Sequence, residues 1–423
     1  MTFRLRSSPA AEAAGIPTSV LVLMAVASGL CAGGNYFNQP LLHSIAVDLD
    51  VTEATVALTV TLAQVAYACG LLLLVPLGDM LERRAAAVTL MLLAAAGQFI
   101  SGFASGIVML SAGIAMAGLF SVAAQILVPL AAILSDPRRS GRAVGIVMSG
   151  LLTGILTARS VAGLLSAWGG WTTIYRVSGV AMVGVAVALW FALPTSRNPS
   201  RVRYADTLRS LYTLLRAHPR LRSRALLGAL SFSSVSVLFS TMALLLSGPS
   251  HGMSEAGIGL VGLAGVAGAL MASVAGRLAD RGWVQTTTAV SVLLIASSWC
   301  ALWLGATSLV WFLAGVLLID LALQGVHINN QHVVFKLEAE ARSRLNAVYM
   351  TGYFIGAAGG SALGSLAWHF GGWPATCVTG GVLGMLGAVA LLHDRRVEQR
   401  SERGVTSRPP SGDACGVARD ASR

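Results

Sequence analysis

The chain repeats itself at a spacing of about 202 residues, because Gly169 matches Gly371 and 371 − 169 = 202. Several landmarks of the first half return in the same order in the second: Arg142 as Arg344, Gly150 as Gly352, Gly154 as Gly356, and Gly169-Gly170-Trp171 as Gly371-Gly372-Trp373. Asp79 matches Asp280 at a spacing of 280 − 79 = 201. A repeat of this length in a hydrophobic chain predicts two homologous membrane halves that face each other, an arrangement typical of secondary transporters.

Composition supports a membrane protein, because only 11% of the residues are charged and 55% are hydrophobic. A soluble domain carries roughly 25% charged residues. The net charge of +11 comes from arginines in short loops between apolar stretches, so we interpret it as a topology signal beside anionic lipid. We therefore expect a lipid bilayer as partner and no nucleic acid.

Twelve apolar stretches are long enough for a helix to cross the hydrocarbon core, which takes about 20 residues. They fall in two sets of six: 18–40, 54–77, 85–105, 107–134, 143–167 and 172–193, then 225–247, 255–279, 286–305, 308–333, 345–368 and 374–392. The sequence thus predicts an all-α integral membrane protein with 12 transmembrane helices in two pseudo-symmetric six-helix bundles. The predicted segments are an N-terminus (1–17), the bundles (18–193 and 225–392), a linker (194–224) and a polar tail that we expect to be disordered (393–423).

Arginine alternates between the connections and fixes the predicted orientation. The even-numbered connections and the central linker carry arginine, whereas the odd-numbered connections carry none. Because positively charged loops stay in the cytoplasm, both termini and the linker are predicted to be cytoplasmic. Leu208, Leu211, Leu214 and Leu215 predict a short amphipathic helix in the linker.

Two connections at equivalent places carry an aspartate beside arginine. The first reads Val75-Pro-Leu-Gly-Asp79-Met-Leu-Glu-Arg83-Arg84, and the second reads Gly276-Arg-Leu-Ala-Asp280-Arg281. Both resemble the signature loop of the major facilitator superfamily, G-x-x-x-D-[RK]-x-G-R-[RK]. Val75, Met80 and Glu82 depart from that pattern, and the second copy lacks the trailing bases. Together with the repeat, the resemblance covers about residues 18 to 392 and implies alternating access between two halves.

The resemblance implies a gating role for these loops, whose contacts must break when the inner side opens. The residues concerned are Asp79, Arg83, Arg84, Gly276, Asp280 and Arg281. The alternative is that they are ordinary charges at the membrane surface.

Spaced glycines mark the fifth and eleventh spans, and we predict that they pack helices closely. They are Gly150 and Gly154, and then Gly352, Gly356 and Gly360. The first pair sits where proton-coupled drug antiporters of the superfamily have G-x-x-x-G-P-x-x-G-G, but Ile155, Ala158 and Arg159 depart from that motif. The run Asn35–Pro40, together with the loop Leu74–Arg84, also resembles bacterial facilitators described as sugar, nucleoside or drug exporters, which implies a bacterial inner membrane.

Two charges lie at membrane depth, where each costs at least about 2.5–3.5 kcal/mol. Asp320 is the acidic residue well inside a predicted span, and Arg159 lies deep in the fifth. A carboxyl in such a place can take up and release a proton, and a nearby arginine lets substrate compete with that proton. We therefore predict proton coupling by Asp320, Arg159 and His327. A fixed ion pair, a helix-packing contact or a simple hydrogen bond is the alternative for each.

The resemblance also implies that the first, fourth, seventh and tenth spans line a central cavity. The residues that it places near substrate are Asn35, Tyr36, Asn38, Gln125 and Gln324. Gln64 and Tyr67 of the second span are added as positions at the cavity edge. Asp320, Gln324 and His327 share one helical face at spacings of four and three residues. Any single amide has the alternative role of joining helices. The few aromatic residues in this set argue against a bulky lipophilic cargo.

The leading prediction is a proton-coupled exporter (antiporter) of a small organic solute. A symporter or uniporter that imports a metabolite is the alternative, with Arg159 favouring an anion in that case, and a non-transporting membrane sensor is a third class. We expect a monomer that is not an enzyme and uses no cofactor and no metal. Lys336 is the single lysine and lies in no G-x-x-x-x-G-K-[ST] loop, so ATP is not expected to drive it.

Overall fold

Every regular element is a helix in the computed structural model, which describes residues 16–136, 139–196, 203–262, 275, 277–278, 281–338 and 341–406. A helix satisfies its own backbone hydrogen bonds, which lipid cannot do. The N-terminal half contains α1 (Thr18–Gly33), α2 (Leu42–Asp48), α3 (Glu53–Leu73), α4 (Arg83–Gly102), α5 (Ile107–Phe120), α6 (Ala123–Leu134), α7 (Ser140–Gly169) and α8 (Thr172–Ala192). The linker and the C-terminal half contain α9 (Tyr204–Ala217), α10 (Pro219–Ser247), α11 (Glu255–Val261), α13 (Val284–Leu304), α14 (Leu309–Phe335) and α15 (Arg342–Thr406).

Ten segments of the described chain are long and apolar enough to cross a membrane. One of them lies in α15, which joins the predicted spans 345–368 and 374–392 across non-helical backbone at Gly371 and Gly372. The described residues include the beginning of the predicted span 255–279, which forms α11. The predicted twelve-helix architecture therefore agrees with the elements that the structure describes.

The first span is longer than predicted and is not a uniform α-helix. Between α1 and α2 the chain forms two short 3₁₀ segments, η2 (Gly34–Tyr36) and η3 (Gln39–Leu41). The predicted span 18–40 therefore continues to Asp48. A 3₁₀ stretch inside a helix often marks a functional position.

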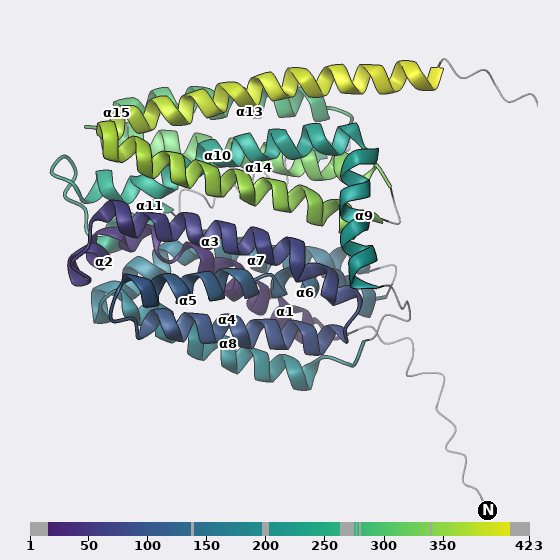
Figure 1. The fold of residues 1–423 in the computed structure, drawn as a ribbon, viewed down its shortest axis with the longest axis horizontal. Helices are drawn as coiled ribbons and strands as arrows, with labels where there is room; N and C mark the ends of the chain where they lie inside the picture. Colours follow the sequence, from purple (N-terminus) through teal and green to yellow (C-terminus); the bar gives the residue numbers. More distant parts are fainter. Residues whose placement is uncertain are drawn as a thin grey trace, which may run out of the picture.

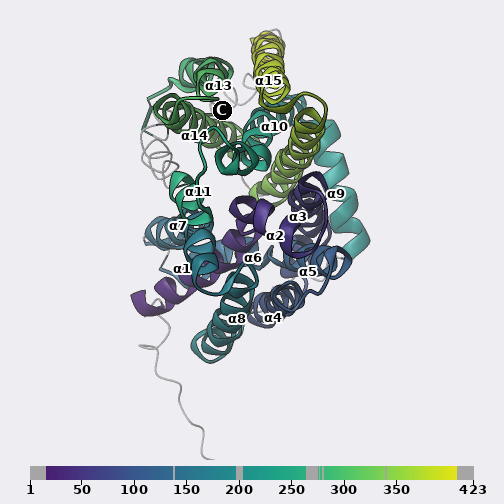
Figure 2. The ribbon, with the colours of Figure 1, turned by 90° about the vertical axis from the view of Figure 1, so that its left-hand side faces the viewer.

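The helices form two groups that α9 connects (Figures 1 and 2). The helices α1 to α8 lie in one group, and α10, α13, α14 and α15 lie in the other. The predicted amphipathic linker helix is α9, which runs across the ends of both groups with Leu211 and Leu214 buried. The Tyr204 hydroxyl donates a hydrogen bond to the Leu73 carbonyl, 2.8 Å away, so α9 is attached to the N-terminal half.

The described contacts between the halves include those of two helix pairs. The α3–α15 pair has a hydrogen bond of 3.0 Å between the hydroxyls of Thr61 and Ser361. The α7–α11 pair has a hydrogen bond of 2.7 Å from the Ser160 hydroxyl to the Gly259 carbonyl. Thr52 caps α3, and its repeat counterpart Ser254 caps α11, so the duplication extends to the start of both interface helices.

The spaced glycines lie at helix contacts that are related by the repeat. A Cβ on Gly154 would lie 2.3 Å from the Gly29 Cα, and one on Gly150 would lie 2.5 Å from the Ala25 Cβ, so α7 contacts α1 backbone to backbone. In the second half, a Cβ on Gly356 or Gly360 would lie 2.2 or 2.0 Å from the carbonyl oxygens of Ala229 or Ser233. Gly352 is less tightly enclosed, at 3.5 Å from the Ala225 Cβ.

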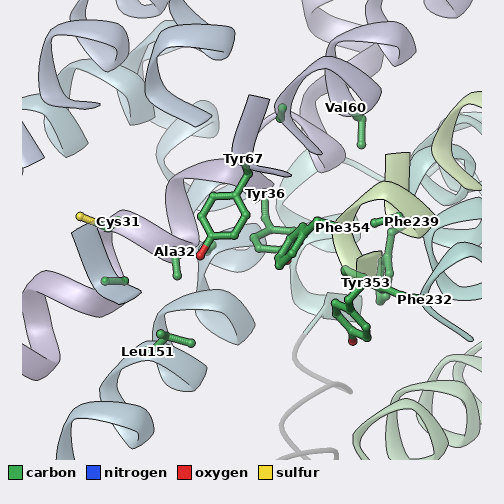
Figure 3. Close-up of a cluster of buried hydrophobic side chains, with 14 of the residues drawn as sticks. Cys31, Ala32, Tyr36, Val60, Tyr67, Leu151, Phe232, Phe239, Tyr353 and Phe354 are labelled. Carbon is green, nitrogen blue, oxygen red and sulfur yellow. The ribbon is translucent and has the colours of Figure 1, made fainter. Parts of the chain in front are cut away.

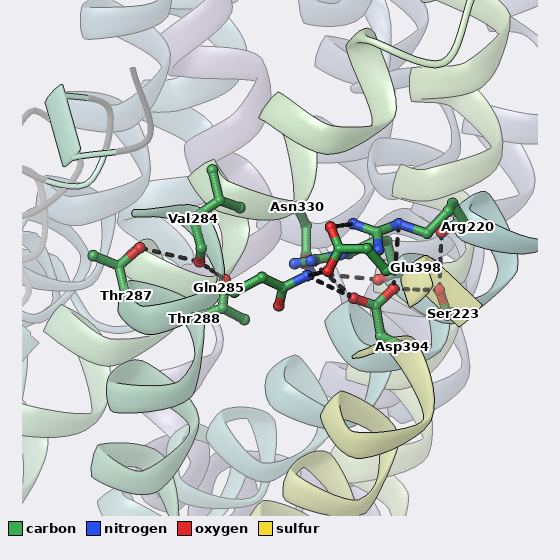
Figure 4. A network of polar contacts seen from close by, with 10 residues as sticks. Arg220, Ser223, Val284, Gln285, Thr287, Thr288, Asn330, Asp394 and Glu398 are labelled. Carbon is green, nitrogen blue, oxygen red and sulfur yellow. Dashed lines mark hydrogen bonds and ion pairs between the residues drawn. The ribbon is translucent and has the colours of Figure 1, made fainter. Parts of the chain in front are cut away.

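A buried charge cluster anchors the end of α15 against α10 (Figure 4). Arg224 and Asp394 are both fully buried and form an ion pair of 2.8 Å. Arg220 pairs with Glu398 at 2.9 Å, and the Ser223 hydroxyl donates to Asp394. We expected a linker to residue 224 and a disordered tail from residue 393; instead α10 begins at Pro219 and α15 continues to Thr406. The reason is that Asp394 and Glu398, which were predicted to lie in the tail, pair with Arg224 and Arg220, which were predicted to lie in the linker.

The Gly154→Ala variant is expected to unfold at a lower temperature than wild type in detergent, because its Cβ meets the backbone of Gly29. Gly145→Ala on the same helix is the matched control, since a Cβ there meets nothing within 4 Å. Alanine is a better helix former than glycine by about 1 kcal/mol, so the control should unfold at the same or a higher temperature. An equal response of the two variants would contradict the packing role.

Asp394→Leu should destabilise the protein by roughly 3–5 kcal/mol, because it leaves the buried Arg224 charge without its closest partner. The double variant Arg224→Met with Asp394→Leu should recover much of that loss, since an apolar pair carries no desolvation cost. Denaturant unfolding of the two variants and wild type measures both effects. A double variant no more stable than the single one would refute the ion-pair explanation.

Candidate functional site

Arg159 lies buried at the contact between the two halves. It belongs to α7, and its Nε donates a hydrogen bond of 2.6 Å to Gln39 Oε1 of η3. Its guanidinium carbon lies 3.7 Å from the ring centroid of Phe239 on α10 and 5.0 Å from that of Tyr36. A cation over an aromatic face is attracted by the ring quadrupole. Arg159 is thus held by one amide and two rings, which come from both halves.

Asp320, on α14, is half-buried and near the Arg159 charge without a fixed ion pair. The groups that interact electrostatically with its carboxyl are Arg159, Tyr36 and Tyr353. Among the described residues, no ion pair within 4.0 Å joins Asp320 to Arg159. Its Oδ2 has no hydrogen-bond partner in the described part of the chain. This carboxyl is therefore not locked into one contact.

Aromatic rings from both halves meet in one cluster (Figure 3), and two of them, Tyr36 and Phe239, lie over the Arg159 guanidinium. Tyr67 of α3 packs on Phe354 of α15 with ring centroids 4.4 Å apart. Phe232 of α10 stacks on Tyr353 at 4.2 Å and contacts Phe354 edge to face at 5.5 Å. The predicted cavity residues include few aromatics, and further rings lie at this interface. Phe232, Phe239, Tyr353 and Phe354 escaped prediction because an aromatic in an apolar span is not distinguishable from a core or lipid-facing residue.

His327 is connected to the charge cluster at the α9 end of the molecule. Its Nδ1 lies 3.1 Å from the Tyr349 hydroxyl, which also accepts from Asn330 Nδ2 at 3.5 Å. Asn330 Oδ1 accepts from Arg224 Nη1 at 3.2 Å, and Arg224 pairs with Asp394. Asp320, Gln324 and His327 are all half-buried on α14, and His327 also packs on Tyr353 at 4.8 Å.

The other predicted cavity residues lie in the N-terminal half at two different places. Gln125 of α6 donates a hydrogen bond of 3.3 Å to the Tyr67 hydroxyl, so both belong to the aromatic region. Gln64 is buried. Asn35 and Asn38 instead line a small chamber formed entirely by N-terminal residues, where Asn38 Nδ2 donates to Thr59 Oγ1 at 3.0 Å. Within the described residues, no group of three or more potential ligands could hold a metal ion.

Residues 24–337 match the family model described as Major Facilitator Superfamily. The chain belongs to this superfamily. Several of its relatives are named as transporters. The uncharacterized transporter YgaY of Escherichia coli O157:H7 is 47% identical over 368 residues, which are 87% of this chain and 93% of the relative.

A second relative is named as a chloramphenicol resistance protein, from Streptomyces lividans. It is 31% identical over 299 residues, which cover 67% of this chain and 72% of the relative. Among solved structures, a mutant of the nucleoside transporter NupG superposes with a TM-score of 0.71. That match covers 89% of this chain and 99% of the other, and at 12% identity it shows the fold alone.

The facilitator signature loop is attached within the N-terminal half. Arg84 Nη1 donates to the carbonyls of Leu193 at 3.2 Å and Trp190 at 3.4 Å, just at the end of α8. The backbone N–H of Arg83 donates to the Ser196 carbonyl at 3.0 Å. The side chain of Asp79, and residues Gly276 and Asp280, lie outside the described residues, while the backbone N–H of Arg281 donates to the Arg277 carbonyl. A gate between the halves therefore stays a prediction.

Glu82 stands where the signature has a glycine, and it caps α4. Its carboxylate accepts from the backbone N–H groups of Arg84 at 3.1 Å, Ala85 at 2.8 Å and Ser196 at 2.9 Å. Burial raises the pKa of this carboxyl, but these three hydrogen bonds and the Arg84 charge outweigh burial and hold the pKa below its ordinary value. Glu82, which departs from the family pattern, thus caps α4 and connects the loop to the segment after α8.

The capping role predicts a pH dependence of stability. Because folding lowers the Glu82 pKa, its contribution is present above the ordinary value of 4.5 and is lost as pH falls through the folded pKa. Glu82→Gln should therefore lower the thermal unfolding midpoint at neutral pH, and the difference from wild type should shrink below pH 4.5. Asp50→Asn, at an exposed loop position, is the control. A difference that stays constant with pH would refute the charged cap.

Proposed function

We propose that this chain is a proton-coupled exporter of a small organic solute, and that Asp320 carries the coupled proton. The single observation that supports this is the Asp320 carboxyl, which lies in the apolar helix α14 near the Arg159 charge and has no ion pair within 4.0 Å to it among the described residues. A carboxyl in that position can bind and release a proton, whereas one locked in a salt bridge cannot do so easily. Because Arg159 is nearby, substrate and proton can compete for the site.

The transport step in this proposal is alternating access between the bundles 18–193 and 225–392, with both termini and α9 in the cytoplasm. The contacts Thr61–Ser361 and Ser160–Gly259 join the halves, and Ser166 also donates to Glu255 near the ends opposite α9. These contacts would break when the outer side opens. The gating loops would act at the other side.

Export is favoured over import by one relative. That relative is named as a chloramphenicol resistance protein, and removal from the cell is one way a membrane transporter can give resistance. The aromatic rings beside Asp320 also offer a surface for an organic molecule with an apolar part. A single monomer would suffice, since the site lies within one chain.

The alternative is import of an anionic metabolite by symport or uniport. It is supported by Arg159, which uses its Nε for Gln39 and carries further N–H donors on its guanidinium. In that case Arg159 would bind the substrate, and Asp320 would hold Arg159 in place. His327, linked to Tyr349, is a second candidate proton carrier in either case.

Substrate-evoked proton movement in inverted membrane vesicles tests this function. The panel contains chloramphenicol, sugars, nucleosides, amino acids, organic anions and cationic drugs. Wild type should release protons from the vesicle lumen when a substrate is added, because an antiporter exchanges lumenal protons for solute. Asp320→Asn should abolish this signal and still exchange labelled for unlabelled substrate, since that exchange needs no net proton transfer.

Asp206→Asn is the matched control, because this aspartate is exposed on α9. It should behave as wild type. A wild-type proton signal that persists in Asp320→Asn would refute the coupling role of Asp320. Transport of an anion with no proton signal, lost in Arg159→Gln, would favour the alternative.

A further inference from the structure

The stretch 34–41 of the first span, which contains the two 3₁₀ segments, presents side chains in two directions. Asn35 and Asn38 line the small chamber of the N-terminal half, whereas Tyr36 and Gln39 contact Arg159. One short segment thus separates the chamber from the candidate site.

The chamber is small, polar and surrounded by buried residues. Its volume is about 10 Å³ for the centre of a water-sized sphere, which is room for about one water molecule. The polar residues that line it are Asn35, Asn38, Gln98, Ser101 and Tyr175. They come from the 3₁₀ region, α4 and α8, and each is at most 5% exposed.

Four oxygens of these residues have no hydrogen-bond partner in the described part of the chain: Asn38 Oδ1, Gln98 Oε1, Ser101 Oγ and Tyr175 OH. The orientation of the Asn38 amide is fixed, because Thr59 donates its hydroxyl to the Val56 carbonyl and must accept from Asn38 Nδ2. An unsatisfied polar group in a buried place costs about 1–3 kcal/mol. Four such oxygens belong to residues that line one chamber, which points to a ligand.

The four oxygens match the hydrogen-bonding capacity of one water molecule. Ser101 and Tyr175 have hydroxyl protons to donate, and the oxygens of Asn38 and Gln98 accept. A water molecule accepts two hydrogen bonds and donates two, and buried waters make about three such bonds. A metal cation fits less well, because none of the five polar lining residues is charged.

We propose that this chamber binds a single structural water molecule that joins α4 and α8 to the 3₁₀ region of the first span. The bound water fixes Asn38 on one side of the segment. It therefore also positions Gln39, which follows directly and accepts the hydrogen bond of Arg159. The chamber is a positioning element of the candidate site and does not depend on the direction of transport or on proton coupling.

Tyr175→Phe and Ser101→Ala each remove one oxygen and leave the packing almost unchanged. If water is bound, both variants should lower the thermal unfolding midpoint, because the water loses a partner. If the hydroxyls have no ligand, removing them should leave the midpoint unchanged or raise it, since a buried unsatisfied group is lost. The sign of the change in the unfolding midpoint therefore distinguishes a bound water from an empty chamber. Tyr212→Phe is the matched control, because Tyr212 is 55% exposed on α9.

A metal cation is the competing ligand. Thermal unfolding in choline chloride, sodium chloride and potassium chloride tests whether one is bound. Wild type should show the same unfolding midpoint in all three salts; stabilisation by one metal cation that is lost in Tyr175→Phe would overturn the water assignment. A crystal structure of wild type provides a readout that does not require the variants to fold. Density about 2.7–3.2 Å from at least three of the four oxygens is expected, and a chamber without density would overturn the proposal.

Discussion

The structure depends on how one buried charge is accommodated where the two halves meet. Arg159 cannot reach water from its place in α7, and a charge in a membrane span costs at least about 2.5–3.5 kcal/mol. The protein meets this cost with the Gln39 amide, the ring faces of Phe239 and Tyr36, and the nearby charge of Asp320. Because these groups come from three spans in both halves, any rearrangement of the halves must change the surroundings of Arg159.

The two halves deal with buried polarity in different ways although they share one architecture. The C-terminal half buries formal charges, with Arg224 and Asp394 paired and hydrogen-bonded to neighbours on α10, α14 and α15. The core of the N-terminal half around the chamber uses neutral amides and hydroxyls. Removing one partner from the charge cluster leaves a buried charge unpaired, which costs more than the loss of a neutral hydrogen bond.

The sequence predicts the architecture well because each span, loop and glycine pattern is a local signal. Gly154 and Gly356 could be assigned to helix packing from their spacing, and the structure places both against a neighbouring backbone. Contacts between distant spans could not be predicted in this way. Gln39 is one amide among many in the sequence, and Asp394 follows the last apolar stretch as an ordinary surface charge would. Only the fold brings Gln39 to Arg159 and Asp394 to Arg224.

The stretch 34–41 of the first span places neighbouring polar residues in two different surroundings. Asn35 and Asn38 line the chamber, whereas Tyr36 and Gln39 contact Arg159. The first pair faces neutral partners within its own half, and the second faces a charge shared with the opposite half. Rotation of this short segment would therefore disturb both surroundings at once.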